Sequence, residues 1–235
     1  MPIVASYNIH GCVGRDGALA PERIAAVIRE LDADVVALQE VDAQHHADRY
    51  LDQWVFLAET LGYHCVPGIS LRTHRRDYGN AVLVRTPPEA VRLHDLSVAR
   101  REPRGAIDLD LTLGGVPIRL VATHLGLSGA ERRAQIIHLL HILADGAQRA
   151  ATILLGDLNE WFRGSRNLRR LAERFPTEPA RASFPAGRPM LALDRILVRG
   201  EMRVSELAAH RSPLARVASD HLPVRAVLRW QGERV

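Results

Sequence analysis

The sequence predicts an α/β (α+β) fold, in which strands and helices alternate and some neighbouring strands form hairpins. Apolar runs at residues 3–7 and 35–38 flank a segment that has helical spacing of apolar residues after Pro21. This strand–helix–strand order is typical of an α/β layer. Gly114-Gly115 separates two further strand-like runs, which indicates an antiparallel hairpin. Together these observations predict a protein of mixed α and β structure.

The first elements along the chain are two strands on either side of a helix. The strand at residues 3–7 is closed by Asn8, and a glycine-punctuated loop follows at 11–17. A helix begins at Pro21, a residue that suits the first helical turn. Its apolar residues recur at helical spacing, at Ile24, Val27, Ile28 and Leu31. The strand at 35–38 is expected to end at Gln39-Glu40.

Polar segments and one helix follow. Residues 42–50 are expected to form a solvated loop, in which His45-His46 is a poor metal site because adjacent side chains point in different directions. A helix is predicted over 51–61, with Gly62 as its end. Residues 72–78 are predicted to be a basic loop, either leaning over an anionic ligand or simply solvated. A strand is predicted at 81–85, after Gly79-Asn80.

The second half is predicted to hold most of the strands. Ser128 with Glu131 fits a capping box that opens a helix through Leu143, with Arg132 and Arg133 facing outward. Residues 163–175 are expected to be partly helical and 176–190 to form a long loop. The expected strands are 91–98, 106–113, 116–123, 152–155, 191–198, 204–207 and 222–228.

Composition indicates a soluble globular protein. The chain has 235 residues, of which 47% are hydrophobic and 25% charged, which suits one domain over residues 1–235. No apolar run approaches the roughly 18 residues of a membrane span. The N-terminus lacks the basic segment of a signal peptide. Cys12 and Cys65 have neither metal-site nor disulfide-framework spacing, so a reducing, cytoplasmic setting is expected.

The positive charge is carried by arginine. The formal net charge is +4, and the sequence contains no lysine. Arginine favours two-pronged contacts with phosphate and carboxylate groups, although high-GC codon usage would also explain its abundance. The charge permits an anionic substrate without requiring one.

A set of polar residues follows the predicted apolar strands. Its members are Asn8, Glu40, His124, Asp157 with Asn159, and Asp220-His221. In open sheets, ligands bind beyond the strand ends. Carboxylate and amide oxygens suit Mg²⁺, or Mn²⁺, better than zinc, and histidines add acid–base capacity near neutral pH. The set fits transfer of a phosphoryl group to water. For Asp157 and Asn159 taken alone, a loop with ordinary turn residues is an equal alternative.

Six short motifs then reveal a resemblance to a known family. In chain order they are Asn8, Leu38-Gln39-Glu40, Thr123-His124-Leu125, Gly156-Asp157-Leu158-Asn159, Leu193-Asp194-Arg195-Ile196 and Ser219-Asp220-His221. Their order resembles the endonuclease/exonuclease/phosphatase superfamily, which includes deoxyribonuclease-I-like nucleases, sphingomyelinases and inositol polyphosphate 5-phosphatases. The resemblance covers residues 3 to about 228. It implies a four-layered α/β/β/α sandwich, with two mixed sheets packed face to face.

The resemblance also implies a metal site. Glu40 would be the main Mg²⁺ ligand, with Asn8 beside it and Asp220 as a further carboxylate on the metal side. The substrate would be held by Arg101 or Arg104, which resemble a phosphate-contacting arginine of nuclease relatives, and by Asn80.

The catalytic residues are implied in the same way. His221 would contact the scissile phosphate, oriented by Asp194. Asp157 would activate the attacking water and Asn159 would help to hold the phosphate, with His124 as the second histidine of the site. A carboxylate behind a histidine fixes its tautomer and favours its charged form.

The resemblance predicts the reaction class better than the substrate. The expected activity is a Mg²⁺-dependent phosphodiesterase acting on nucleic acid or on a phospholipid headgroup, with no obligate protein partner. The alternatives are a phosphomonoesterase on a small metabolite and a catalytically silent binding module. The chain shows no aromatic-rich insert for abasic-site recognition, and its aromatic content is only 5%. A serine hydrolase using Ser219 is rejected because the sequence has no Gly-x-Ser-x-Gly elbow.

Overall fold

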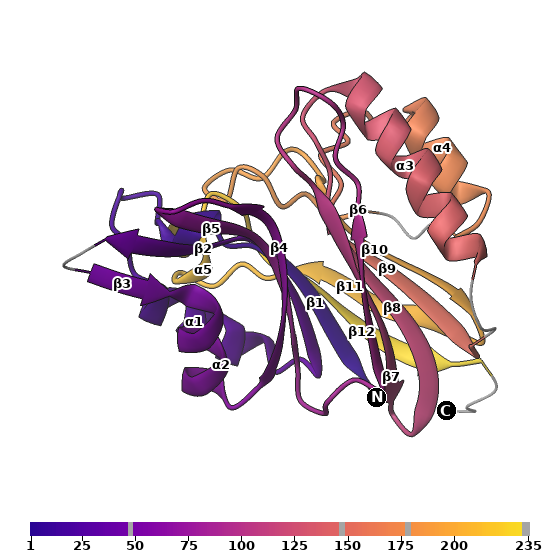
Figure 1. Cartoon of the computed structure of the whole chain (residues 1–235). Helices are drawn as coiled ribbons and strands as arrows, with labels where there is room; N and C mark the ends of the chain where they lie inside the picture. The colour runs from indigo at the N-terminus through magenta and orange to yellow at the C-terminus, as the bar shows by residue number, and fades with distance from the viewer. Residues whose placement is uncertain (47–48, 146–148, 177–179, 232–235) are drawn as a thin grey trace.

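The computed structural model describes residues 1–46, 49–145, 149–176 and 180–231, and two sheets pack face to face within it (Figure 1). Seven of the described strands form the first sheet, in the order β11-β12-β1-β2-β5-β4, with β3 paired to β2. Within it only β1 and β2 are parallel. Its strands are β1 (Ile3–Asn8), β2 (Val35–His46), β3 (Arg49–Asp52), β4 (His64–Arg72), β5 (Arg76–Val84), β11 (Met202–Ala209) and β12 (Val224–Trp230).

Five of the described strands form the second sheet, in the order β10-β9-β8-β7-β6. They are β6 (Ala90–Asp95), β7 (Gly105–Leu113), β8 (Val116–His124), β9 (Ala151–Asp157) and β10 (Asp194–Gly200). The pair β8 and β9 is parallel, and α3 (Gly129–Ala144) lies between them in the chain. The predicted hairpin at Gly114-Gly115 joins β7 to β8.

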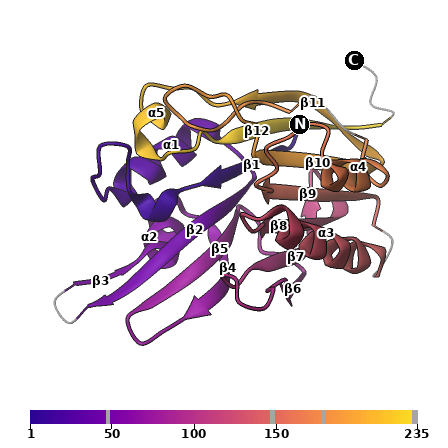
Figure 2. The same cartoon turned by 90° about the horizontal axis from the view of Figure 1, so that it is seen from above.

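Helices cover the outer face of each sheet, so the predicted four-layered sandwich is confirmed. The first sheet packs on α1 (Pro21–Leu31), α2 (Gln53–Leu61) and α5 (Ala215–Ala218), which share an apolar cluster with it. The second packs on α3 and α4 (Arg166–Ala172). Seen from above, α1 and α2 lie at one side of the sheets and α3 and α4 at the other (Figure 2). No helix formed by the described residues has the length and apolar character needed to cross a bilayer.

The core between the sheets is built from every second residue of the strands. On β9, Ala151, Ile153 and Leu155 belong to this core, whereas Leu154 packs outward on the helices. The same alternation holds on β8 and β10. Because side chains in a strand alternate between faces, the next residue on the inner stripe of β9 is Asp157. The polar end of each stripe therefore lies at the rim of the inter-sheet core.

Two segments that were predicted to be loops form strands instead. β2 continues beyond Glu40 to His46 and pairs with β3, so the loop prediction for 42–50 is wrong except at residues 47–48, which lie outside the described residues. The predicted basic loop at 72–78 is also shorter, because β4 runs to Arg72 and β5 begins at Arg76. These strand ends project beyond the core in Figure 2. Their polar composition reflects solvent exposure of a paired ribbon, which the sequence pattern alone does not distinguish from a loop.

The capping box of α3 is confirmed, but the orientation of one arginine is not as predicted. Ser128 Oγ accepts from the Glu131 backbone N–H, and the Glu131 carboxylate accepts in return from Ser128. Arg132 does not face outward: it is buried, and its Nε donates to Glu160 Oε1 at 2.8 Å. Glu160 also accepts from Asn167 Nδ2 at 2.6 Å. This ion pair ties the start of α3 to the segment after β9.

Candidate active site

The ends of three neighbouring strands bring three predicted site residues into one row. In the register of the second sheet, Asp157 on β9 is opposite His124 on β8 and opposite Asp194 on β10. All three side chains are buried. Each is the polar end of an inner stripe, so they face the first sheet at the rim of the shared core.

Gly156 allows β9 to lie close enough to β8 for Asp157 to reach the rim of the core. Its φ is 144°, and a Cβ placed on it would lie 1.8 Å from the backbone oxygen of Thr123. Only glycine fits so close an approach of two strands. The chain then turns at Asn159, which has a φ of 51° and whose backbone N–H donates to Asp157 Oδ1 at 2.9 Å. The adjacent Asp and Asn thus form a turn and also belong to the site.

Glu40 is set by an irregularity in β2. The pairing of β2 with β5 shifts between Leu38 and Val41, so Gln39 and Glu40 together lie opposite Asn80. Glu40 itself has a φ of 58°. This is the geometry of a β-bulge, which re-aims a side chain. Asn80 is buried at the bulge, and its backbone oxygen accepts from Trp54 Nε1.

Asn8 connects the two sheets at the site. Its Nδ2 donates to Glu40 Oε1 at 2.9 Å and to Asp157 Oδ2 at 3.2 Å. Its Oδ1 accepts from the His10 backbone N–H. In this arrangement the amide nitrogen of Asn8, rather than its oxygen, faces the two carboxylates.

His221 and Asp194 form a buried pair beside Asp157. His221 Nδ1 lies 2.9 Å from Asp194 Oδ2, and its Nε2 lies 3.7 Å from Asp157 Oδ2. Burial would lower the pKa of His221, but the charge and hydrogen bond of Asp194, with the charges of Asp157 and Asp220, raise it to about 10. The ring also packs on Phe184, at 4.8 Å between centroids. His221 is therefore a charged imidazolium with a fixed orientation.

His124 has the opposite character. Its Nδ1 lies 3.1 Å from Arg104 Nη1 and its Nε2 lies 3.1 Å from Asn159 Nδ2. Burial, followed by the positive charges of Arg104 and His221, holds the pKa of His124 well below its ordinary value. The site therefore contains one charged and one neutral histidine on either side of Asp157.

Asp157 lies between the histidines, and its own pKa is raised. Burial is the main cause and the negative charge of Asp194 adds to it, while His221 and the hydrogen bonds from Asn159 and Asn8 oppose the shift. Its Oδ2 is 3.6 Å from His124 Nε2. A carboxylate with a raised pKa, held by fixed donors, has the character of a general base.

Asp220 lies next to this group. Ser219 Oγ donates to the backbone oxygen of Asn8 at 2.8 Å and lies 3.3 Å from Asp220 Oδ1. The segment before β12 is thereby tied to the end of β1. The residues of the six motifs, from Asn8 to His221, are thus brought together at one rim of the sandwich.

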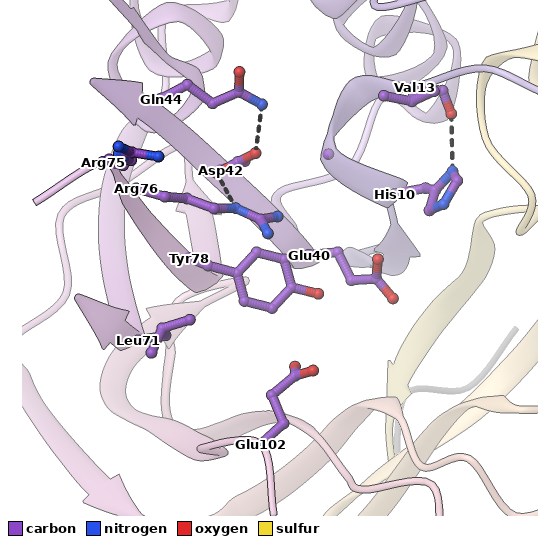
Figure 3. A pocket seen from close by; sticks show the side chains of 11 residues that line it. His10, Val13, Glu40, Asp42, Gln44, Leu71, Arg75, Arg76, Tyr78 and Glu102 are labelled. Atoms are coloured by element: carbon purple, nitrogen blue, oxygen red, sulfur yellow. Dashed lines mark hydrogen bonds and ion pairs between the residues drawn. The ribbon is translucent and has the colours of Figure 1, made fainter. Parts of the chain in front are cut away.

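A cavity of about 560 Å³ opens beside Glu40. In Figure 3 the side chains of Tyr78 and Glu102 point into it, and the Glu40 carboxylate is turned toward the side on which His10 lies. Tyr78 comes from the projecting end of β5, and the Arg76 guanidinium lies 4.5 Å above its ring. Burial, then the charges of Glu40 and Glu102, raise the pKa of the Tyr78 hydroxyl. This hydroxyl is therefore a neutral hydrogen-bond donor at the edge of the site.

One cluster among the described residues has the spacing of a metal site. Ligand atoms of Asp157, Asp194 and His221 all lie within 4.8 Å of one another. Asp194 Oδ2 is already engaged, because it accepts from Ser183 Oγ and faces His221 Nδ1. Glu40 is not a member of this cluster, but its carboxylate and that of Asp157 both accept from the Asn8 amide.

The two candidate arginines lie in different environments. Arg104 is buried and contacts both His124 and, at 3.1 Å, Glu102. Arg101 is exposed in the turn before β7. Arg104 therefore contacts the site through His124, whereas Arg101 is exposed next to Glu102, a residue of the cavity lining.

Several residues near the site were not found from the sequence. They are His10, Ser183, Tyr78 and the exposed pair Trp161-Phe162. Trp161 and Phe162 are 53% and 76% exposed and follow Asn159 by two and three residues. An aromatic pair beside the Asp-x-Asn motif was a usable signal, whereas Ser183 and Tyr78 depend on long-range packing.

Comparison with known proteins agrees with this geometry. A model of the endonuclease/exonuclease/phosphatase family matches residues 5–221. The protein YbhP of Escherichia coli K12 is 31% identical over 95% of this chain and 94% of its own length.

Two solved structures share the fold. The mannosyl-6-phosphatase Bt3783 of Bacteroides thetaiotaomicron superimposes with a TM-score of 0.76 and 18% identity, over 98% of this chain and 100% of that one. D. rerio TDP2, complexed with a single-strand DNA product, superimposes with a TM-score of 0.72 and 16% identity, over 97% of this chain and 98% of that one. The family match covers all six motifs and the site they form. The chain therefore belongs to the endonuclease/exonuclease/phosphatase family, a family of phosphoester hydrolases.

Proposed function

We propose that this protein is a divalent-metal-dependent phosphodiesterase that hydrolyses nucleic acid or a phospholipid headgroup. One observation carries the proposal: Glu40 and Asp157, from different sheets, share the amide of Asn8, and the His221 imidazolium lies 3.7 Å from the same Asp157. Acidic oxygens for a cation and a charged donor for a phosphate thus lie side by side.

The oxygen ligands fit a hard cation such as Mg²⁺, with Mn²⁺ as an alternative. Glu40 is the main ligand, and Asp220 supplies a further carboxylate from the segment before β12. Rotation of the Asn8 amide would turn its oxygen toward the same point. The bound cation would neutralise charge on the phosphate oxygens.

His221 and Asp194 act on the phosphate. Asp194 holds the imidazole by its Nδ1, at 2.9 Å, which leaves the Nε2–H to donate to a phosphate oxygen. The raised pKa keeps this donor charged at neutral pH. A charged donor stabilises the negative charge that develops in the transition state.

Asp157 is the base for the attacking water. It accepts the water proton as the new oxygen–phosphorus bond forms and the bond to the leaving oxygen breaks. Asn159, whose N–H donates to Asp157 Oδ1, and the neutral His124, 3.6 Å from Oδ2, help to hold this carboxylate and to position the phosphate. Arg104 acts by holding His124, and Asn80 supports the substrate side of the Glu40 bulge.

Two features favour a diester over a monoester as the substrate. The cavity beside Glu40 offers Tyr78 and Leu71 to one substituent of the phosphate. The exposed aromatic pair Trp161-Phe162, two and three residues after Asn159, would offer stacking or lipid contacts to the second substituent. The TDP2 structure with its single-strand DNA product supports a diester by analogy.

The second candidate is a phosphomonoesterase on a small phosphorylated metabolite. Asp42, Gln44 and Glu102 line the cavity with acceptors that suit the hydroxyls of a sugar, and the mannosyl-6-phosphatase shares the fold. A cytoplasmic setting remains part of the proposal, and the free thiols of Cys12 and Cys65 are compatible with it.

The test is an activity panel with Mg²⁺ or Mn²⁺. Plasmid DNA, RNA, abasic oligonucleotide, sphingomyelin and bis-p-nitrophenyl phosphate are compared with phosphomonoesters. We expect turnover of a diester, lost on chelation. The double substitution Trp161→Ala with Phe162→Ala should raise KM for the large diester and leave the rate on bis-p-nitrophenyl phosphate unchanged. Faster turnover of sugar phosphates than of every diester would favour the second candidate instead.

A further inference from the structure

We propose that His10 is a nitrogen ligand of the same cation as Glu40, so that this site prefers Mn²⁺ or Co²⁺ to Mg²⁺. The inference rests on the proposed metal-dependent function. It concerns a histidine that neither the six motifs nor the mechanism uses.

The His10 side chain lies at the same cavity as Glu40. Both residues line it, and in Figure 3 the His10 ring and the Glu40 carboxylate are on the same side of it. The backbone of His10 belongs to the same network, because its N–H donates to Asn8 Oδ1 while Asn8 Nδ2 donates to Glu40. The imidazole is therefore tied to the same cavity and the same hydrogen-bond network as the proposed main ligand.

The tautomer of His10 is fixed by the backbone. Its Nδ1 lies 3.1 Å from the Val13 carbonyl oxygen. A carbonyl can only accept, so Nδ1 carries the proton and Nε2 carries the lone pair. Within the described part of the chain, Nε2 has no hydrogen-bond partner. A histidine that ligates a metal usually donates its other ring N–H to a carbonyl or carboxylate in this way.

The turn that carries His10 has a strained backbone. His10, Gly11 and Cys12 have φ values of 49°, 59° and 61°, in the left-handed region that two non-glycine residues rarely adopt. Such strain persists where surrounding contacts enforce it, and it occurs often at functional sites.

The buried side chain of Gln53 holds this turn in place through hydrogen bonds. Its Nε2 donates to the Gly11 backbone oxygen at 2.7 Å, and its Oε1 accepts from the Asp42 N–H at 3.0 Å. Asp42 lies two residues beyond Glu40 on β2. The side chain of Gln53 thus fastens the His10 turn to the strand that carries Glu40.

The chemistry of the ligands follows from this placement. Mg²⁺ is bound almost entirely through oxygen atoms. Imidazole nitrogen binds Mn²⁺ better than Mg²⁺, and it binds Co²⁺, Ni²⁺ and Zn²⁺ better still. Adding one nitrogen to a carboxylate set therefore shifts the preference toward first-row transition metals.

The experiment measures metal binding directly on the full-length apo protein. Calorimetric titrations with MnCl₂, CoCl₂ and MgCl₂ compare wild type, His10→Asn and the control His64→Ala, which lies at the exposed start of β4. Asparagine tolerates the left-handed backbone and so preserves the turn. We expect His10→Asn to weaken Mn²⁺ and Co²⁺ binding by about 10–100-fold, while Mg²⁺ affinity and the control change little.

Pulsed EPR of bound Mn²⁺ supplies a second readout. Wild type and His64→Ala should show coupling to an imidazole nitrogen, and His10→Asn should lose it. Coupling that persists in His10→Asn, or is absent from wild type, overturns the role of His10 while the metal-dependent function stands. A wild-type protein that binds none of the three cations overturns both.

Discussion

Asn8 and Asp157 are 149 residues apart in the chain, yet Asn8 Nδ2 donates to Asp157 Oδ2 at 3.2 Å, from one sheet to the other. The same nitrogen donates to Glu40 at 2.9 Å. One amide therefore holds two buried or partly buried carboxylates in place. The Nδ2 donor of Asn8 lies between the two negatively charged carboxylates, where a positive charge would stabilise both. We therefore place the cation at this position.

This relationship predicts that Asn8→Asp makes stability dependent on a divalent cation. The substitution replaces a donor by a third carboxylate, which should destabilise the apo protein by about 1–3 kcal/mol. Millimolar MgCl₂ or MnCl₂ should restore the melting temperature, because a cation binds the folded state.

Asn167→Asp is the matched control, since Asn167 Nδ2 also donates to a carboxylate, that of Glu160. It should lower the melting temperature without rescue by the cation. Equal rescue of both variants, or of neither, would contradict the assignment of the site.

The pH dependence of activity should report the two perturbed groups. Asp157 must be deprotonated to act as a base, so kcat/KM should fall as the pH drops through its raised pKa. His221 must be charged, so the rate should fall again near its pKa of about 10. Asp194→Asn removes the main support of that charge and should move the alkaline limb to lower pH.

The raised pKa of His221 also determines how the free energy of unfolding changes with pH. The pKa of His221 in the folded protein is above its unfolded value, so its stabilisation is complete below about 6.5 and is lost as the pH rises toward about 10. Thermal unfolding of the apo wild type and Asp194→Asn between these values checks this. If the alkaline limb of the kcat/KM profile does not move in Asp194→Asn, His221 takes no part in the reaction as a charged group.

Period-two patterning made much of the site predictable from the sequence. Asn8, His124, Asp157 and Asp194 each continue the inner stripe of an apolar strand, and the register places the last three in one row. Parity of position along a strand is visible in a sequence. The pairing of strands in the sheets is not visible in a sequence, and here the family motifs predicted which strand ends come together.

The remaining features depend on local backbone geometry and long-range packing. The bulge at Glu40 interrupts the period, so the sequence suggested that β2 ended there. Arg132 was assigned to solvent because arginine on a helix is usually exposed, but Glu160 from the segment after β9 compensates for its burial. Arg101 and Arg104 are indistinguishable in sequence, and the structure separates them because Arg104 is buried against His124 whereas Arg101 is exposed.

That contact gives a matched pair of substitutions. Arg104→Ala should lower kcat by about 10–100-fold, the usual cost of removing a group that orients a functional histidine. Arg104→Lys should restore part of the rate. Arg101→Ala should leave kcat on bis-p-nitrophenyl phosphate unchanged.

On a nucleic acid substrate, an Arg101 that contacts phosphate would show itself in salt dependence. Arg101→Ala should then reduce the slope of log K against log salt by about one. Steady-state kinetics and binding measured at several salt concentrations separate the two arginines. A larger loss of kcat in Arg101→Ala than in Arg104→Ala would reverse their assignment.

The glycine before Asp157 gives a prediction about stability. Gly156→Ala places a methyl group against the Thr123 carbonyl, which lies only 1.8 Å from the ideal Cβ position. The free energy of unfolding should fall by more than about 2 kcal/mol. Gly164→Ala, where a Cβ meets nothing within 4 Å, should change it by less than about 0.5 kcal/mol. Urea denaturation measures both, and similar values for the two variants would show that β8 and β9 approach less closely than described.

The most direct test of the metal-centred account is Glu40→Gln, which keeps the size of the side chain and removes its charge. The measurement is the rate of diester hydrolysis as a function of Mg²⁺ concentration, with circular dichroism as a check on the fold. We predict a folded protein whose Mg²⁺-dependent activity is abolished. A variant with wild-type activity and an unchanged Mg²⁺ dependence would contradict the account.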